Sequence, residues 1–176
     1  FVYMNDALLT DGELNSMNLT KYGQIKSAGL GDGSFVMGCC CAIRREFLDI
    51  VLPIPHGVGA HDNWLVEIAE GLVAKRIDAK VLQYYRRHGG NESQFIANRL
   101  TRVSRWSRYA DSFINALYSK DDDGTRMLGQ SSLFLDGLVS LHTKVPAAYQ
   151  VPFAQLIDKR LNTFELLKKR THARES

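Results

Sequence analysis

The pattern of apolar positions changes along the chain near residue 93. Before this point, short apolar runs alternate with stretches that contain glycine and proline, which is typical of an α/β domain. After it, apolar side chains recur at intervals of three or four residues, as in amphipathic helices. The pattern therefore predicts an α/β part over residues 1–93 and a helical extension over residues 94–176.

Two strands and a loop are predicted at the start of the chain. Residues 1–4 are apolar and predict a short buried strand that ends at Asn5 and Asp6. Residues 13–34 are polar and contain several glycines, so they predict a long surface loop. Residues 34–43 are almost continuously apolar, which is typical of a strand covered on both faces.

Two helices and two further strands follow in the α/β part. Residues 44–52 predict a short helix, which Pro53 stops because proline cannot continue a helix. The apolar residues of 64–72 have helical spacing. Strand-like segments come next at residues 72–77 and 80–85, the second with an alternating pattern.

The helical extension is expected to contain three helices. The first covers residues 94–119, the second residues 126–144, and the third begins at Pro146. An acidic run with a glycine at residues 121–124 is expected to break the first helix from the second and to form a solvated loop. The predicted fold class is thus α/β followed by a three-helix tail.

Composition and charge narrow the class of protein. Hydrophobic residues make up 45% of the 176 positions and charged residues 23%, so a disordered chain is not indicated. A net charge of +3 does not by itself indicate a nucleic-acid binder, and we expect no nucleic-acid partner. No apolar run reaches the roughly 18 residues of a membrane span. Consecutive Cys39, Cys40 and Cys41 fit neither a zinc site nor a disulfide framework, which favours reduced thiols and a cytoplasmic location.

The first candidate for chemistry lies where a glycine-containing loop, residues 56–60, meets the helix predicted at Trp64. Here His61 and Asp62 stand at the junction. In one interpretation Asp62 is a helix N-cap, which contributes about 1 kcal/mol. In the other, its carboxylate accepts a proton from an attacking hydroxyl, a role that accelerates a reaction about 10²–10⁴-fold. One oxygen can cap while the other faces a substrate, so both interpretations stay open.

The second candidate is the basic turn Arg86-Arg87-His88-Gly89-Gly90, which follows the last predicted strand. The guanidinium of arginine matches phosphate oxygens, and neutral histidine binds divalent metals. The alternative is an exposed basic turn without a ligand.

Five segments follow one another along the chain. They are Val2-Tyr3-Met4-Asn5-Asp6, Val36-Met37-Gly38-Cys39, Arg44-Arg45 with Pro53-Ile54-Pro55, His61-Asp62-Asn63-Trp64, and Tyr85-Arg86-Arg87-His88-Gly89-Gly90-Asn91. In their order and spacing they resemble the second half of family 2 glycosyltransferases, and most closely the bacterial rhamnosyltransferase-like branch. The resemblance covers residues 1–93, and the helical extension resembles those of such enzymes only loosely. It implies a partial GT-A fold, the acceptor-side half of a Rossmann-like sheet that binds a nucleotide sugar.

The resemblance assigns roles on the acceptor side. It makes Asp62 the general base, with His61 orienting it and Trp64 as an aromatic residue of the acceptor site. Gly38 falls in the segment beneath the acceptor pocket, where Cys39 is expected to pack rather than to act as a nucleophile.

On the donor side, Arg86, Arg87 and Asn91 fit the loop that approaches the diphosphate, and His88 is a candidate ligand for Mg or Mn. The family's metal-binding Asp-x-Asp motif lies upstream of the strand at residues 1–4 and has no counterpart here, so this chain alone is expected to be inactive.

The implied function is the inverting transfer of a hexose from a nucleoside-diphosphate sugar to a glycan or lipid-linked acceptor, in the synthesis of cell-surface polysaccharides. With a lipid-linked acceptor, the protein would be able to contact the inner face of the membrane peripherally. Four arginines of the first tail helix allow the same contact, and the alternative is that they form a solvated helix face. These are Arg99, Arg102, Arg105 and Arg108.

Two other functions are compatible with the residues. One is a metal-dependent hydrolase that uses His56, His61, Asp62 and His88, although no helical HExxH-type spacing supports it. The other is a non-catalytic helical module in which the tail mediates interaction or oligomerisation, with a homodimer as the expected form.

Overall fold

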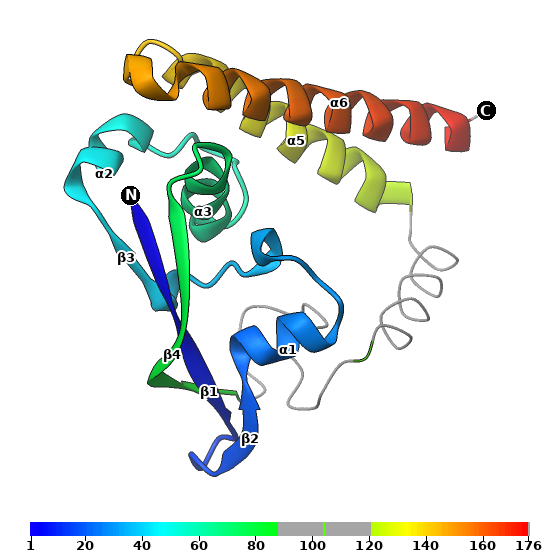
Figure 1. The fold of residues 1–176 in the computed structure, drawn as a ribbon. Coiled ribbons are helices and arrows are strands. Elements are labelled where there is room, and N and C mark those ends of the chain that lie inside the picture. Colours follow the sequence, from blue (N-terminus) through cyan, green and yellow to red (C-terminus); the bar gives the residue numbers. More distant parts are fainter. Residues whose placement is uncertain (88–103, 105–120, 176) are drawn as a thin grey trace. The chain divides into compact units, whose positions relative to one another are not determined.

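The computed structural model describes residues 1–87, 104 and 121–175, which form an α/β fold with a mixed four-stranded sheet (Figure 1). The chain divides into two compact units. Of the described residues, unit 1 contains 1–2, 43–75 and 121–175, and unit 2 contains 3–42, 76–87 and 104. Each unit is therefore assembled from segments that are far apart in the sequence.

In the sheet, β1 pairs with each of the other three strands. It is antiparallel to β2, with Leu8 opposite Thr20 and a bulge before Thr10. It is parallel to β4, because the two strands are hydrogen-bonded at equivalent ends: the Val2 amide donates to the Ala74 carbonyl (3.1 Å), and the Arg87 amide donates to the Thr10 carbonyl (2.9 Å). The strands are β1 (Val2–Thr10), β2 (Ser16–Thr20), β3 (Cys41–Ile43) and β4 (Lys75–Arg86).

The first strand is longer than predicted, and its expected end at Asn5 and Asp6 is wrong. Both residues are buried inside β1. The polar side chain of Asp6 is accommodated because its Oδ1 accepts hydrogen bonds from the amides of Ala7 (2.7 Å) and Tyr22 (2.8 Å). A buried carboxylate with two amide donors does not interrupt the strand.

The predicted surface loop at residues 13–34 is also wrong. It contains β2, the helix α1 (Lys21–Ser27) and the 3₁₀ turn η1 (Asp32–Ser34). The Oγ1 atom of Thr20 caps α1 by accepting a hydrogen bond from the Gly23 amide at 3.1 Å. The segment is too short and polar for helical periodicity to reveal this helix.

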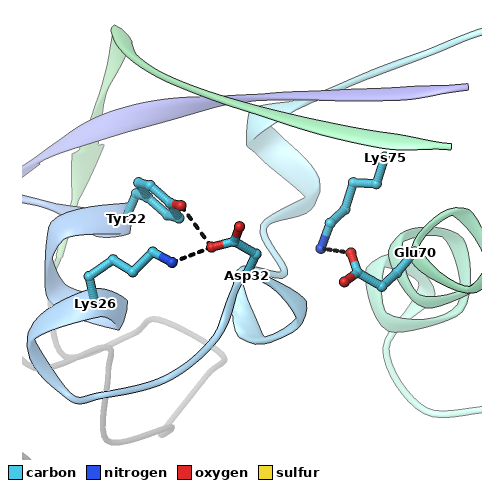
Figure 2. A network of polar contacts seen from close by, with 5 residues as sticks. All are labelled: Tyr22, Lys26, Asp32, Glu70 and Lys75. Atoms are coloured by element: carbon cyan, nitrogen blue, oxygen red, sulfur yellow. Dashed lines mark hydrogen bonds and ion pairs between the residues drawn. The ribbon is translucent and has the colours of Figure 1, made fainter. Parts of the chain in front are cut away.

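A polar cluster connects α1 to η1 in unit 2 (Figure 2). Tyr22 donates its hydroxyl hydrogen to Asp32 Oδ1 at 2.7 Å, and Lys26 forms an ion pair with the same carboxylate. The hydrogen bond to Asp32 raises the pKa of Tyr22 above its ordinary value. Lys26 and Asp32 are exposed and Tyr22 is half-buried, so the cluster orders the surface of unit 2 and contributes little stability.

The apolar segment at residues 34–43 is only partly the predicted strand. Its last residues form β3, whereas Gly38–Cys40 form the 3₁₀ turn η2. Phe35 and Cys40 are buried and Cys39 is exposed, and the cysteines hold thiols rather than disulfides. The hydrogen bond with Cys39 and burial raise the pKa of the Cys40 thiol, which makes it a packing residue rather than a nucleophile. The expectation of a strand covered on both faces is therefore wrong, as is the expectation that Cys39 packs, because Cys39 and Ala42 are exposed.

In unit 1, the predicted helices at residues 44–52 and 64–72 are confirmed as α2 (Arg45–Val51) and α3 (His61–Gly71). The two strands predicted after α3 are one continuous strand, β4. An ion pair connects the end of α3 to β4, with the buried Lys75 Nζ 2.6 Å from Oε2 of the exposed Glu70 (Figure 2).

The C-terminal helices α5 (Asp121–Leu141) and α6 (Gln150–Glu175) lie side by side and antiparallel, joined through the 3₁₀ turn η4 (Ala147–Tyr149) (Figure 1). The predicted break at residues 121–124 is wrong, because these residues are part of α5. An acidic run with one glycine therefore does not by itself distinguish a loop from a helix. Members of the unit 1 core come from α2, α3, α5 and α6: Phe47, Trp64, Ile68, Leu138, Leu141, Phe153 and Leu156.

Several sequence predictions fall on residues that the structure does not describe. Among them are the helix at 94–119 (apart from residue 104) with its row of arginines, and the boundary between residues 93 and 94. Within the described parts of the chain, no helix is long and apolar enough to cross a membrane.

Candidate functional site

Asp62 lies in the first turn of α3 but does not cap it. The N-cap residue is Ala60, which makes no side-chain capping bond, and α3 already begins at His61. Asp62 Oδ1 instead accepts a hydrogen bond from the Asn63 amide at 3.0 Å. The N-cap interpretation is therefore wrong by position. The carboxylate is half-buried at the helix start, where the positive end of the helix dipole favours a negative charge.

The other two predicted residues at this helix start differ sharply in exposure. His61 is exposed on the first residue of α3, whereas Trp64 is completely buried. Trp64 donates its Nε1 hydrogen to the Val51 carbonyl at 3.0 Å and meets Phe134 edge to face, with ring centroids 5.0 Å apart. The structure thus places Trp64 in the core of unit 1, where it anchors α3, and not on the surface that an acceptor would contact.

The loop that leads into α3 lies against α5. Gly57 adopts a φ of +81°, and a Cβ atom there would lie 2.8 Å from Leu133 Cδ1. The positive φ favours glycine, because an L side chain would be strained there, whereas the end of the Leu133 side chain could move to relieve the contact. A Cβ at Gly59 would lie 4.0 Å from Gln130 Nε2. The approach to Asp62 is therefore shaped by the first half of α5.

Three predicted ligand-binding residues belong to unit 2. Gly38 starts η2 and is half-buried. Arg86 ends β4 with its side chain exposed, and Arg87 is half-buried beside it. The predicted residues His88 and Asn91 lie outside the described part of the chain. Because Asp62 and His61 belong to unit 1, a cleft shared by the carboxylate and the basic turn stays a prediction.

Sequence inspection missed a buried lysine in unit 2. Lys21, the first residue of α1, has only 2% of its surface exposed. Its Nζ lies 3.5 Å from Gln24 Oε1 and 5.7 Å from the centre of the Tyr85 ring, and the guanidinium of Arg87 lies 6.0 Å from the same ring. Burial and the charge of Arg87 lower the pKa of Lys21 to about 8. A lysine in a polar segment carries no local signal of burial, so only the fold reveals it.

The lowered pKa of Lys21 predicts a pH effect on stability. Below about pH 8 the amine is charged in both states, and its burial disfavours folding. Between pH 8 and the ordinary lysine value of 10.5, the folded state loses this proton before the unfolded state does, so stability rises with pH. From about pH 7.5 to about pH 9, we expect the free energy of unfolding of wild type to rise by about 1 kcal/mol relative to Lys21→Met.

Urea denaturation at the two pH values measures this difference. The matched control is Lys80→Met, which removes an exposed lysine of β4 in the same unit and should follow wild type. Equal pH dependence in Lys21→Met and wild type would show that Lys21 is not held as a buried amine.

The described side chains do not assemble the predicted metal site. Among residues 1–87, 104 and 121–175, no group of three or more His, Cys, Asp or Glu side chains could hold a metal ion. His56 and His61 lie in unit 1, and the fourth ligand of the hydrolase alternative, His88, lies outside those residues. The described residues thus supply no metal site, and we derive no step through one.

Comparisons with protein-family models, with curated proteins and with solved structures find no match to this chain. Function is therefore inferred from the order of its motifs and from the contacts within each unit.

Proposed function

We propose that this chain forms the acceptor-side part of a GT-A, family 2 inverting glycosyltransferase. It would transfer a hexose from a nucleoside-diphosphate sugar to a glycan or lipid-linked acceptor. One observation carries the proposal: a half-buried carboxylate, Asp62, stands in the first turn of α3 directly after a loop whose glycines lie against α5. A general base must be rigidly placed and yet reachable, and this position combines both properties.

In the proposed reaction, Asp62 takes the proton of the acceptor hydroxyl as its oxygen attacks the anomeric carbon. The new bond joins acceptor oxygen to sugar carbon, and the bond from that carbon to the diphosphate oxygen breaks on the opposite face. The configuration at the anomeric carbon inverts as a result. The hydrogen bond from the Asn63 amide to Asp62 Oδ1 would fix the orientation of the carboxylate.

The donor side of the proposal rests on the end of β4. Arg86 is exposed there, and its guanidinium could neutralise charge on the departing diphosphate. Arg87 would contribute a second positive charge. His88 and Asn91, which lie outside the described residues, complete the proposed set.

The stereochemistry of transfer tests this function. We expect the complete protein to release nucleoside diphosphate from one member of a panel of nucleoside-diphosphate sugars only when a suitable glycan or lipid-linked acceptor is present. Proton NMR of the product should show the anomeric configuration opposite to that of the donor. Retention of configuration would rule out a single displacement with Asp62 as base, and no turnover across donors and acceptors would reject the transferase.

A further inference from the structure

Gly137 of α5 makes a close contact on each side of the segment that carries Asp62. A Cβ atom at this position would lie 2.8 Å from Trp64 Cη2 and 2.8 Å from Pro55 Cγ. Pro55 precedes the glycine-containing loop, and Trp64 follows Asp62 on α3. The backbone of α5 therefore packs directly against both ends of the segment that contains the proposed base.

Further contacts hold the rest of α3 against the C-terminal helices. In its middle, Glu67 forms an ion pair with Arg160 of α6, whose guanidinium also lies 4.4 Å from the centre of the Phe134 ring. At its end, a Cβ at Gly71 would lie 2.7 Å from Leu156 of α6. Since α3 is held along its whole length, a shift at Gly137 cannot be absorbed by sliding the helix, and it would be transmitted to the first turn.

We propose that Gly137 is a positioning residue for Asp62, so that α5 sets where the base stands. This inference rests on the proposed function. A catalytic group must be held close to its productive geometry, and a misplacement of about 1 Å can cost about 100-fold in rate. Through Gly137, the C-terminal helix pair would then help to fix the position of the base.

The same helix offers a matched control. Glycine inside a helix is about 1 kcal/mol less favourable than alanine, so a glycine there needs a reason. A Cβ at Gly129, also in α5, would meet nothing within 4 Å. Gly129→Ala and Gly137→Ala thus make the same chemical change in one helix, with open space at the first site and a collision at the second.

Steady-state kinetics of the complete protein test the proposal. Gly129→Ala should keep the wild-type kcat, whereas Gly137→Ala should lower kcat about 10–100-fold and leave the donor KM within about twofold. Leu138→Ala serves as a second control, because it removes a fully buried side chain of α5 and destabilises the fold by about 2–5 kcal/mol. Assayed well below its Tm, Leu138→Ala should keep kcat.

Rescue separates positioning from general damage. Trp64→Phe removes two of the atoms that the new Cβ would meet, Trp64 Cη2 and Cζ3, and leaves the contact with Pro55 Cγ. The double variant Gly137→Ala with Trp64→Phe should therefore recover at least about fivefold in kcat over Gly137→Ala, a coupling of the size seen between contacting residues. If Gly137→Ala does not fold alone, the double variant is compared with Trp64→Phe. Because the contact with Pro55 remains, a lower kcat in the double variant supports the positioning role, and an equal kcat contradicts it.

The outcomes that contradict the inference are distinct. A Gly137→Ala protein as active as Gly129→Ala would remove the positioning role while leaving the transferase in place. An equal loss of kcat in Leu138→Ala would also remove the positioning role, because destabilisation alone would then explain the loss in Gly137→Ala. A wild-type protein without transferase activity would instead reject the proposed function and, with it, the role of Gly137.

Discussion

Replacing Asp62 by asparagine is expected to lower the rate of sugar transfer by about 10²–10⁴-fold, the usual contribution of a general base. Asparagine has nearly the same shape, and its side-chain oxygen can still accept the hydrogen bond that the Asn63 amide donates to Asp62. The variant therefore removes the proton acceptor while keeping the local structure. We expect kcat to fall, whereas nucleoside-diphosphate binding and the Tm stay close to those of wild type.

The control for this experiment is Asp158→Asn, which changes an exposed carboxylate of α6 in the same unit. It should keep wild-type kinetics. Measured with saturating donor and acceptor, a wild-type rate in Asp62→Asn would show that another group takes the proton. A fall in Tm would point instead to a structural role for this carboxylate.

Replacing Trp64 by alanine is expected to reduce the free energy of unfolding by about 3–5 kcal/mol, as for other large aromatic residues removed from a core. The indole is completely buried against Phe134 and against Gly137 of α5, so its loss leaves a cavity between α3 and α5. It also leaves the Val51 carbonyl without its Nε1 donor. Urea or thermal denaturation measures the loss.

Trp64→Phe is the conservative counterpart, since it keeps a ring in the core but removes the donor to Val51. Its cost should be clearly smaller than that of Trp64→Ala. If the alanine variant lost less than about 1 kcal/mol, Trp64 could not be the anchor of α3, and its side chain would be available for the acceptor-site role that the family resemblance implies.

Helices were the most predictable elements, because their signals are local. Pro53 and the apolar residues from Trp64 to Leu72 were enough to predict α2 and α3, and the apolar spacing beyond residue 126 was enough for the two described tail helices. The same local reasoning placed Asp62 at a helix start, although it did not establish that the N-cap lies at Ala60.

Strands and buried polar groups were less predictable, because their partners are distant in sequence. β1 continues through Asp6, whose buried carboxylate accepts a hydrogen bond from the Tyr22 amide. The two strands predicted after α3 are one strand, β4, which runs along β1 as far as the hydrogen bond from the Arg87 amide to the Thr10 carbonyl. No window of neighbouring residues contains both members of such pairs.

The sequence by itself determined the α/β class, the helices around Asp62 and a chemically plausible carboxylate. Tertiary structure alone decided that Trp64 is a core anchor, that Lys21 is buried, and that α5 packs on the segment carrying Asp62. Periodicity shows which face of a helix is apolar, but the partner of that face is chosen by packing between segments far apart along the chain.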